Sequence, residues 1–246
     1  MKAIFLGTNN WFDTTTGSTP CILLDAPEAY VILDAGFGIY KADRYMKEEK
    51  PVCLFITHFH IDHVCGLHVL PKFNFKQGLT IFFAKKMTKY YKILFEHPFA
   101  MPAREMRYKV STVGLREGEH AEPFKFECRR LKHADLTYGY RMHLGGKIVT
   151  YCADTAVCEN DYLLGKDSDL FIHECAFIRE KESQWGHTGP EGAADLARRA
   201  NAEKLALTHF GANSYANLEL RRNAEAKARR IFPNTVAATD GMVIEV

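Results

Sequence analysis

The sequence contains no long hydrophobic run and no strong excess of charge of one sign. No stretch approaches the roughly 18 consecutive apolar residues that predict a membrane-spanning helix. The N-terminal "MKAIFLGTNN" also lacks the long apolar segment and cleavage site of a signal peptide. Lysine and arginine total 32 against 30 aspartate and glutamate, so net charge does not point to nucleic acid or a membrane as partner. These absences predict a cytoplasmic protein with no membrane partner.

The sequence also lacks paired cysteine motifs. Its seven cysteines are an odd number, and they lie scattered in apolar segments such as "PVCLFI" and "IHECAFI" without any CxxC pair. This distribution predicts buried thiols in a reducing compartment and argues against a disulfide framework or a cysteine-rich zinc site.

Short apolar runs of strand length dominate what is present. They occur at "AIFLG", "PCILLD", "YVILDAG", "CLFITHF", "LTIFFA", "KIVTYCAD", "DLFIHECAF" and "KLALTHF". Helical patterns appear between several of them, at "GPEGAADLARRANA" and "NLELRRNAEAKARRIF". Strands alternating with such crossovers predict a layered α/β fold. No repeat or flexible linker interrupts the chain, so we expect a single domain over residues 1–246.

The region from about 68 to 110 is the best candidate for an insertion or lid. Its segment "KKMTKYYKILFEH" places Met87, Tyr90, Tyr91, Leu94 and Phe95 on one helical face. Lys85, Lys89 and Lys92 fall on the other. These lysines form either a solvated face, which we favour, or a contact to a substrate phosphate.

The stretch "FITHFHIDHVCG" at residues 55–66 concentrates potential metal ligands directly after an apolar run. His58 and His60 alternate in an extended segment, so both imidazoles can face one point, and Asp62 with His63 follow where the strand should end. Imidazoles and a carboxylate gain nothing from crowding unless a cation collects them. The sequence therefore predicts a metal site here.

The HxHxDH pattern resembles the signature of the metallo-β-lactamase superfamily. In that family the remaining ligands follow later strands in the order His, Asp, His, and this chain offers His133 in "RLKHADL", Asp154 in "TYCADTAV" and His209 in "LALTHFG". The resemblance implies a four-layer αβ/βα sandwich with two metals at one edge. The ligands it implies are His58, His60 and His133 for one metal, Asp62, His63 and His209 for the other, and Asp154 as the bridge.

The ligand types bear on which metal binds and what it does. Imidazole and carboxylate donors without thiolate suit zinc, with manganese as an alternative, and they leave room for water. His60 stands where the di-iron redox branch of the family usually carries a carboxylate, which favours hydrolysis. "ILDAGFG" resembles the family's Asp-x-Gly turn; Asp34 there either orients a metal ligand or makes a plain turn.

A second resemblance narrows the reaction. His173-Glu174-Cys175-Ala176 and His187-Thr188-Gly189 are similar to two motifs of the ribonuclease Z branch. The resemblance to that branch implies that Glu174 orients His187 and that His187 is a general acid at the scissile phosphate. Alternatively, His187 simply caps the helix that starts near Pro190. The implied reaction is phosphodiester hydrolysis by a metal-bridging hydroxide, with Asp62 as proton acceptor.

The sequence departs from tRNA-processing members of that branch. Its first loop, "GTNNWFDTTTGSTP", has no basic residue, and no long glycine-rich basic arm is present. Affinity for tRNA should be weak, because nucleic-acid binding depends on neutralising backbone phosphates. A small phosphodiester, a nucleotide or a short RNA is therefore the expected substrate.

Several alternatives stay open. The same scaffold could hydrolyse an ester, lactone or thioester, or serve as a non-catalytic binding module. A homodimer is expected only by analogy with similar proteins. Aromatic residues either line a pocket for a flat group or belong to the core: Trp11, Phe12, Phe73, Phe75 and Trp185. The remaining histidines are interpreted as surface or packing residues: His68, His97, His120, His143 and His173.

Overall fold

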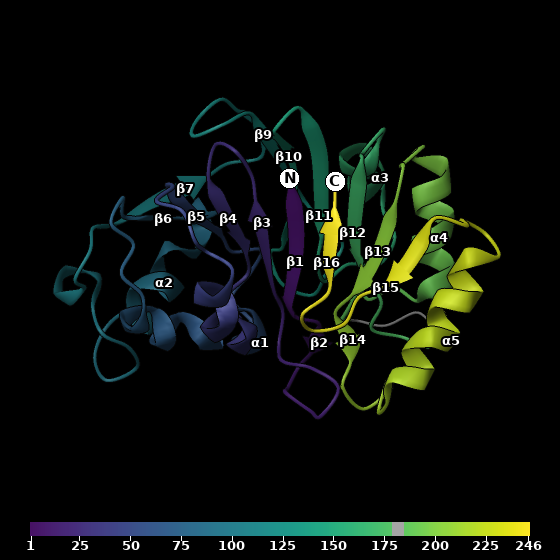
Figure 1. Cartoon of the computed structure of the whole chain (residues 1–246), viewed down its shortest axis with the longest axis horizontal. Helices are drawn as coiled ribbons and strands as arrows, with labels where there is room; N and C mark the ends of the chain where they lie inside the picture. The colour runs from purple at the N-terminus through teal and green to yellow at the C-terminus, as the bar shows by residue number, and fades with distance from the viewer. Residues whose placement is uncertain (179–184) are drawn as a thin grey trace.

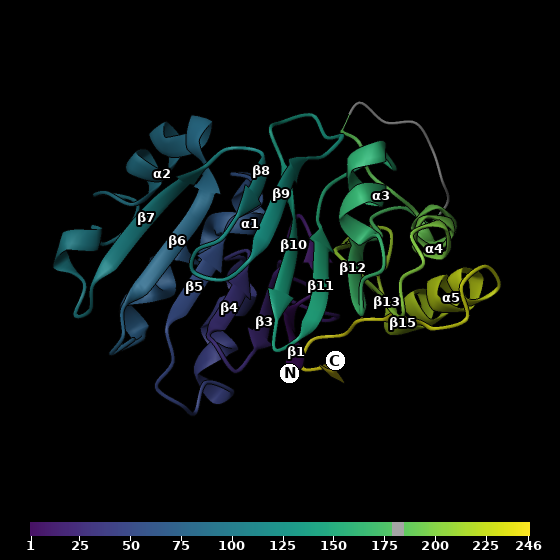
Figure 2. The same cartoon turned by 90° about the horizontal axis from the view of Figure 1, so that it is seen from above.

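Two seven-stranded β-sheets face each other in the computed structural model, which describes residues 1–178 and 185–246. Helices cover the outer side of each sheet, giving the layers helix, sheet, sheet, helix (Figure 1, Figure 2). This arrangement confirms the predicted four-layer αβ/βα sandwich.

The first sheet has the strand order β16-β1-β3-β4-β5-β6-β7. Its strands are β1 (Lys2–Gly7), β3 (Cys21–Asp25), β4 (Tyr30–Leu33), β5 (Val52–Phe55), β6 (Leu79–Ala84), β7 (Val110–Leu115) and β16 (Val243–Glu245). Strands β4 to β7 run parallel and the others antiparallel. β4 and β5 are buried along their whole length, as expected for apolar parallel strands covered on both faces.

The second sheet has the order β15-β13-β12-β11-β10-β9-β8. Its strands are β8 (Gly118–His120), β9 (Phe126–Arg130), β10 (Tyr138–Leu144), β11 (Lys147–Cys152), β12 (Leu170–Glu174), β13 (Leu205–Thr208) and β15 (Thr235–Ala237). Neighbours from β11 to β15 are parallel. A short pair, β2 (Asn9–Asn10) and β14 (Phe210–Gly211), joins the loops that follow β1 and β13. The two sheets are therefore linked at one edge.

Helices complete the outer layers. On the side of the first sheet lie α1 (Ile61–Val64), α2 (Thr88–Leu94) and the 3-10 helices η1 (Phe37–Arg44), η2 (Cys65–Lys72), η3 (Lys85–Met87) and η4 (Ala103–Glu105). On the second sheet lie α3 (Glu159–Gly165), α4 (Pro190–Arg199) and α5 (Leu218–Arg229). The two helices expected from sequence are α4, which begins at Pro190, and α5. No helix in residues 1–178 or 185–246 is long and apolar enough to cross a membrane.

The region from 68 to 110 is only partly peripheral. Its central strand β6 is an internal member of the first sheet. On α2 and its flanks Met87, Tyr91 and Phe95 are buried as expected, whereas Tyr90 is 43% exposed. A cavity lies at the edge of the sandwich where the candidate metal ligands gather. None of its described lining residues comes from the region 68–110, so the role of this region as a lid stays a prediction.

The main core lies between the two sheets, with Phe55 of β5 near its centre. The Phe55 ring stacks on Phe82 of β6, with centroids 4.4 Å apart. It meets Phe126 and Tyr140 of the opposite sheet edge-on, at 5.0 and 5.2 Å. Large buried aromatics dominate core energetics, so this cluster holds the sheets together. A second core packs the other sheet against α3, α4 and α5.

Replacing Phe55 with alanine should lower the free energy of unfolding by about 3–5 kcal/mol, because it leaves a cavity between the sheets. Denaturant unfolding followed by circular dichroism measures this. Phe99→Ala is the matched control, since Phe99 is 61% exposed and its removal should change stability by only about 0.5 kcal/mol. A loss below about 1 kcal/mol at Phe55 would contradict this description of the core.

Candidate metal centre

The candidate ligands converge at the edge of the sandwich where the parallel strands of both sheets end. His58, His60, Asp62 and His63 follow β5, with the last two in the first turn of α1. From the second sheet, His133 follows β9, Asp154 follows β11 and His209 follows β13. Carboxyl ends of neighbouring parallel strands meet at one edge, which is where ligand sites form in such sheets.

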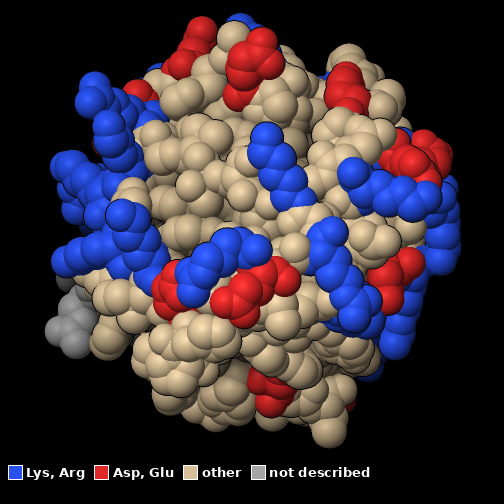
Figure 3. Space-filling view, turned by 90° about the vertical axis from the view of Figure 1, so that its left-hand side faces the viewer, with Lys and Arg blue, Asp and Glu red and all other residues tan. Residues whose placement is uncertain are grey.

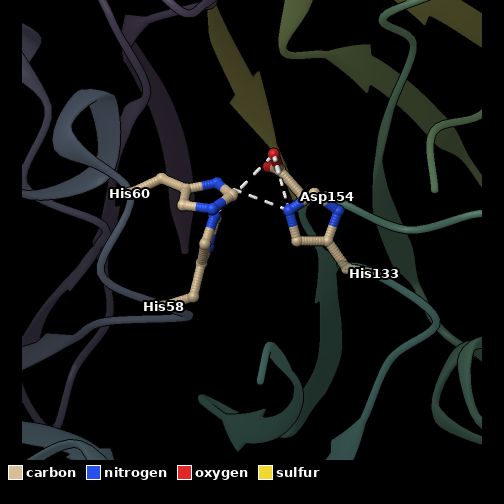
Figure 4. Close-up of side chains that lie close together, drawn as sticks. All are labelled: His58, His60, His133 and Asp154. Atoms are coloured by element: carbon tan, nitrogen blue, oxygen red, sulfur yellow. Dashed lines mark hydrogen bonds and ion pairs between the residues drawn. The ribbon is translucent and has the colours of Figure 1, made fainter. Parts of the chain in front are cut away.

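His58, His60, His133 and Asp154 form the first group of donors (Figure 4). Asp154 Oδ2 lies 3.8 Å from Nε2 of both His58 and His133. His133 Nε2 lies 3.4 Å from His60 Nδ1. Donor atoms of all four residues lie within 4.8 Å of one another, a spacing that one cation can span.

Asp62, His63 and His209 form the second group. Asp154 Oδ1 lies 3.0 Å from His63 Nε2 and 3.1 Å from His209 Nε2. Asp62 Oδ2 lies 3.6 and 3.5 Å from the same two nitrogens. One oxygen of Asp154 thus faces each group, which is the arrangement a bridging carboxylate requires. The structure brings together all seven residues named as ligands from the sequence.

Hydrogen bonds on the outer side of the imidazoles set their orientation. His63 donates from Nδ1 to Asp34 Oδ2 at 2.8 Å, and His58 donates from Nδ1 to Thr57 Oγ1 at 3.0 Å. His133 donates from Nδ1 to the Gly186 carbonyl at 3.2 Å. Donation from Nδ1 fixes the tautomer and leaves the Nε2 lone pair facing the cluster. Of the two interpretations of Asp34, the structure favours the one in which it orients a ligand.

Gly186 has a conformational reason to be glycine. Its φ is +68°, and a Cβ there would lie 2.4 Å from the Lys132 carbonyl oxygen. Only glycine permits both this backbone and this close approach. The position of the Gly186 carbonyl, and with it the ring of His133, depends on that residue.

The chemistry and hydrogen bonding of the donor atoms fit divalent cations. His58 Nε2 and Asp154 Oδ1 are among eight buried side-chain polar atoms of the described residues that have no hydrogen-bond partner, and both belong to the cluster. Buried polar atoms are normally satisfied, and a cation bound at the cluster would satisfy these two. Imidazole and carboxylate clusters of this kind are typical of the binuclear metal site of metallo-β-lactamase-fold proteins.

Electrostatics place two of the donors, Asp154 and His58, in the protonation states that bind cations. Burial opposes ionisation of Asp154, but the charges of His209 and His63 outweigh it and hold the pKa of this carboxyl well below its usual range. Burial, reinforced by the charge of His63, also lowers the pKa of His58 well below its usual range. Asp154 is therefore ionised and His58 neutral, as metal ligation demands. Burial favours neutral His63, but the charges of Asp154, Asp62 and Asp34 outweigh it and raise the pKa of His63 well above its usual value, so this imidazole must release a proton when a cation binds.

Glu174 and His187 form a hydrogen-bonded pair beside the ligands. His187 donates from Nδ1 to Glu174 Oε1 at 2.9 Å, and Glu174 also accepts from the backbone N–H groups of Thr155 and Ala176. His187 is close enough to Asp154 for their donor atoms to fall within one 4.8 Å cluster. Burial favours the neutral imidazole, but the Glu174 carboxylate raises the pKa of His187 to about 9. His187 is thus an oriented side chain that faces the metal-ligand cluster and favours its protonated form when no cation is bound.

Three contacts at the site were not expected from the sequence. Asp135 accepts from His60 Nε2 at 2.9 Å, so His60 faces the cluster with Nδ1. The backbone N–H of Trp11 donates to Asp62 Oδ2 at 2.9 Å, and the Asn10 amide lies 3.3 Å from His209 Nδ1. Of the residues in these contacts, only Asp135 could have been suspected from the sequence, because it closely follows His133.

A cavity of about 890 Å³ opens onto these residues. Trp11 and Trp185 line it, whereas Phe73 and Phe75 are buried in the core and line a different hollow. No lysine is among its described lining residues. Figure 3, a view of the molecule's β7 end, shows lysine and arginine side chains at both edges and across the middle of this face, with acidic side chains between them. The lysines of the α2 region are exposed, as expected for a solvated face.

Comparison with known proteins identifies the family. The family model described as "Beta-lactamase superfamily domain" matches residues 29–210, about three quarters of the chain. The chain belongs to this superfamily. Together with the clustered His and Asp ligands, this makes it a metal-dependent hydrolase of the metallo-β-lactamase fold.

The most informative relatives by sequence are ribonuclease Z proteins. The Bacillus licheniformis protein is 28% identical over 98% of this chain and 97% of its own length. The Synechocystis protein is 27% identical over 100% of this chain and 94% of its own. These full-length relationships place the superfamily member near the ribonuclease Z branch.

Solved structures share the fold at lower identity. A metallo-β-lactamase fold protein from Bacillus subtilis superposes with a TM-score of 0.82 at 21% identity, covering 99% of both chains. Human tRNase Z, short form, gives 0.78 at 21% identity over 100% of this chain and 99% of its own. A diphosphatase of the PhnP family gives 0.74 at 17% identity, covering 100% and 97%.

Replacing Asp34 with asparagine should weaken metal binding by about 10- to 100-fold, because His63 loses the carboxylate that orients it. Asparagine preserves size and tolerates the left-handed backbone of Asp34, whose φ is +59°. Competition with a chromophoric chelator measures the affinity. Asp195→Asn, at a half-buried position on α4 whose side chain pairs with Arg198, is the control and should bind as the wild type does. Equal affinity in both variants would show that Asp34 does not support the site.

Proposed function

We propose that this protein is a phosphodiesterase that acts on a small phosphodiester, a nucleotide or a short RNA and uses two divalent cations, zinc or manganese. The observation that carries the proposal is the Glu174–His187 pair beside the ligand cluster. A phosphodiester brings a negative charge to neutralise and a leaving oxygen to protonate. A cationic imidazole next to bound cations meets both needs.

Each of these side chains has a distinct task. When bound, the two cations supply Lewis acidity and an activated water. His187 keeps Nδ1 on Glu174 and can present its other N–H to the leaving oxygen. Asp62 is better suited to hold a cation than to keep a proton: burial opposes its ionisation, but the charge of His63 and a hydrogen bond with His209 hold its pKa well below the usual range.

Substrate size is supported by what surrounds the cavity. The alignment with the Bacillus licheniformis ribonuclease Z spans 300 positions although this chain has 246 residues, so that relative carries segments with no counterpart here. The loop between Gly7 and Pro20 also lacks basic residues. Both features favour a small substrate over tRNA, whose binding requires many phosphate contacts.

Replacing His187 with alanine should lower kcat by about 10²- to 10⁴-fold for a phosphodiester with an alkyl leaving group. The loss should be smaller for bis(p-nitrophenyl) phosphate, because p-nitrophenolate leaves without needing a proton. Steady-state kinetics with both substrates measure the difference, and metal content should not change.

His97→Ala serves as the control, since its side chain is 67% exposed and pairs with Glu105 at the surface. Equal, unchanged turnover of both substrates by His187→Ala would remove His187 from the reaction. Faster wild-type turnover of a lactone or p-nitrophenyl ester than of any phosphodiester would instead favour the carbon-ester alternative.

The pH dependence of kcat should also reveal the role of His187. The Glu174 carboxylate raises the pKa of His187 to about 9, so the imidazole is protonated below that pH and loses its proton as pH rises through it. Bound cations lower this value, because they favour the neutral imidazole. For an alkyl phosphodiester, kcat should therefore fall with rising pH at or below pH 9. The descending limb should vanish in His187→Ala, and a limb unchanged in that variant would assign it to another group.

A further inference from the structure

We propose that the indole of Trp11 is a stacking platform for a nucleobase, so that the substrate is a phosphodiester of mononucleotide or dinucleotide size. The inference rests on the proposed phosphodiesterase function and specifies its substrate class. It follows from the exposure of Trp11, the way its loop is built, and the chemistry of the cavity that it lines.

Exposed apolar side chains concentrate at the mouth of the cavity. Among the large hydrophobic side chains of residues 1–178 and 185–246, Ile61 and Trp11 are the most exposed, at 67% and 66%. Both line the cavity, as does Trp185 at 51% exposure. Apolar surface gathered at one hollow on a protein surface marks a ligand-binding position.

The backbone of Trp11 is held in a conformation that tryptophan rarely adopts. Its φ is +72°, in the left-handed region, which costs free energy for a residue with a large side chain. In this conformation its N–H donates to Asp62 Oδ2 while its ring lines the cavity. The strain thus places an aromatic face at a fixed position next to a metal ligand.

The loop that carries Trp11 is braced from within. The Asn9 side-chain amide lies 3.1 Å from the Phe12 carbonyl, 2.9 Å from Thr14 Oγ1 and 2.9 Å from the Gly17 carbonyl. The buried guanidinium of Arg221 in turn donates to Asn9 Oδ1. Because these bonds hold the backbone of the loop in place before binding, the loop loses little entropy when a ligand stacks on the Trp11 ring.

The cavity chemistry indicates what stacks there. Its described lining contains no lysine or arginine, but Asn10, Asn213 and Ser214 offer amide and hydroxyl groups. A volume of about 890 Å³ lies within the usual range for small-molecule sites. A flat, neutral group with hydrogen-bonding edges, attached to a single phosphate, fits these walls. A nucleobase has that chemistry, and a long polyanion does not.

Intrinsic fluorescence tests stacking directly, because the chain has only two tryptophans. In Trp185→Phe the emission reports on Trp11 alone. Adenosine 5′-monophosphate should quench this emission saturably, whereas ribose 5-phosphate, which lacks the base, should not. Absence of quenching by the nucleotide, or equal quenching by both compounds, would overturn the proposal.

Kinetics separate this inference from the phosphodiesterase proposal. Adenosine 2′,3′-cyclic phosphate and glycerol 1,2-cyclic phosphate share the reacting cyclic diester, but only the first carries a base. Trp11→Asn removes the ring and suits the left-handed backbone. It should raise KM for the adenosine substrate about 10-fold with kcat unchanged, as expected for lost stacking. Trp11→Tyr should restore most of the affinity.

Phe99→Asn is the control, because Phe99 is 61% exposed and lies outside the lining of this cavity. Equal effects of Trp11→Asn on both cyclic substrates would overturn the stacking role while leaving the phosphodiesterase proposal intact. No turnover of any phosphodiester by metal-loaded wild type would overturn the phosphodiesterase proposal, and the substrate assignment with it.

Discussion

The buried carboxylate of Asp34 is the group on which the rest of the site depends. It accepts hydrogen bonds from Thr57 through both the backbone N–H and Oγ1, from His63 Nδ1 and from the Tyr151 hydroxyl. Burial, with the nearby charge of Asp34, raises the pKa of Tyr151 well above its usual value, so its phenol stays a donor. Because Tyr151 comes from β11 and Thr57 follows β5, one carboxylate joins both sheets to His63, a candidate metal ligand. A buried charge is tolerable only with such partners.

The same edge of the sandwich also positions the chemistry. Parallel strands end in loops that need not pack, so polar residues can collect there while the strands stay apolar. Glu174 is the last residue of β12 and lies at this edge. Its hydrogen bond brings His187 to the ligands, although His187 lies on an irregular segment. The short β2–β14 pair holds the loop of Trp11 against the loop of His209. The same short strand pair therefore helps to position both the candidate ligand His209 and Trp11, the proposed contact to the substrate.

The metal-site residues that lie close together in the sequence were easier to predict than those that distant segments contribute. The HxHxDH run predicts four donors at one point because they lie within six residues, and apolar strand lengths predict the layered fold. His133, Asp154 and His209 were identified only through resemblance to a family, since single residues after strands carry no signal of their own. The contact of Trp11 with Asp62 was beyond the sequence, because it depends on a left-handed backbone and on loop placement. The internal position of β6 likewise follows from sheet order, which residues 68–110 do not encode alone.

The central claim is that two cations bind between the two ligand groups that share Asp154. Crystals grown with zinc or manganese and measured at the metal absorption edge test it most directly. The account predicts two anomalous peaks about 3.5–4 Å apart, one within reach of His58, His60 and His133 and the other within reach of Asp62, His63 and His209. No peak at this edge, or a single peak that does not contact Asp154, would contradict it.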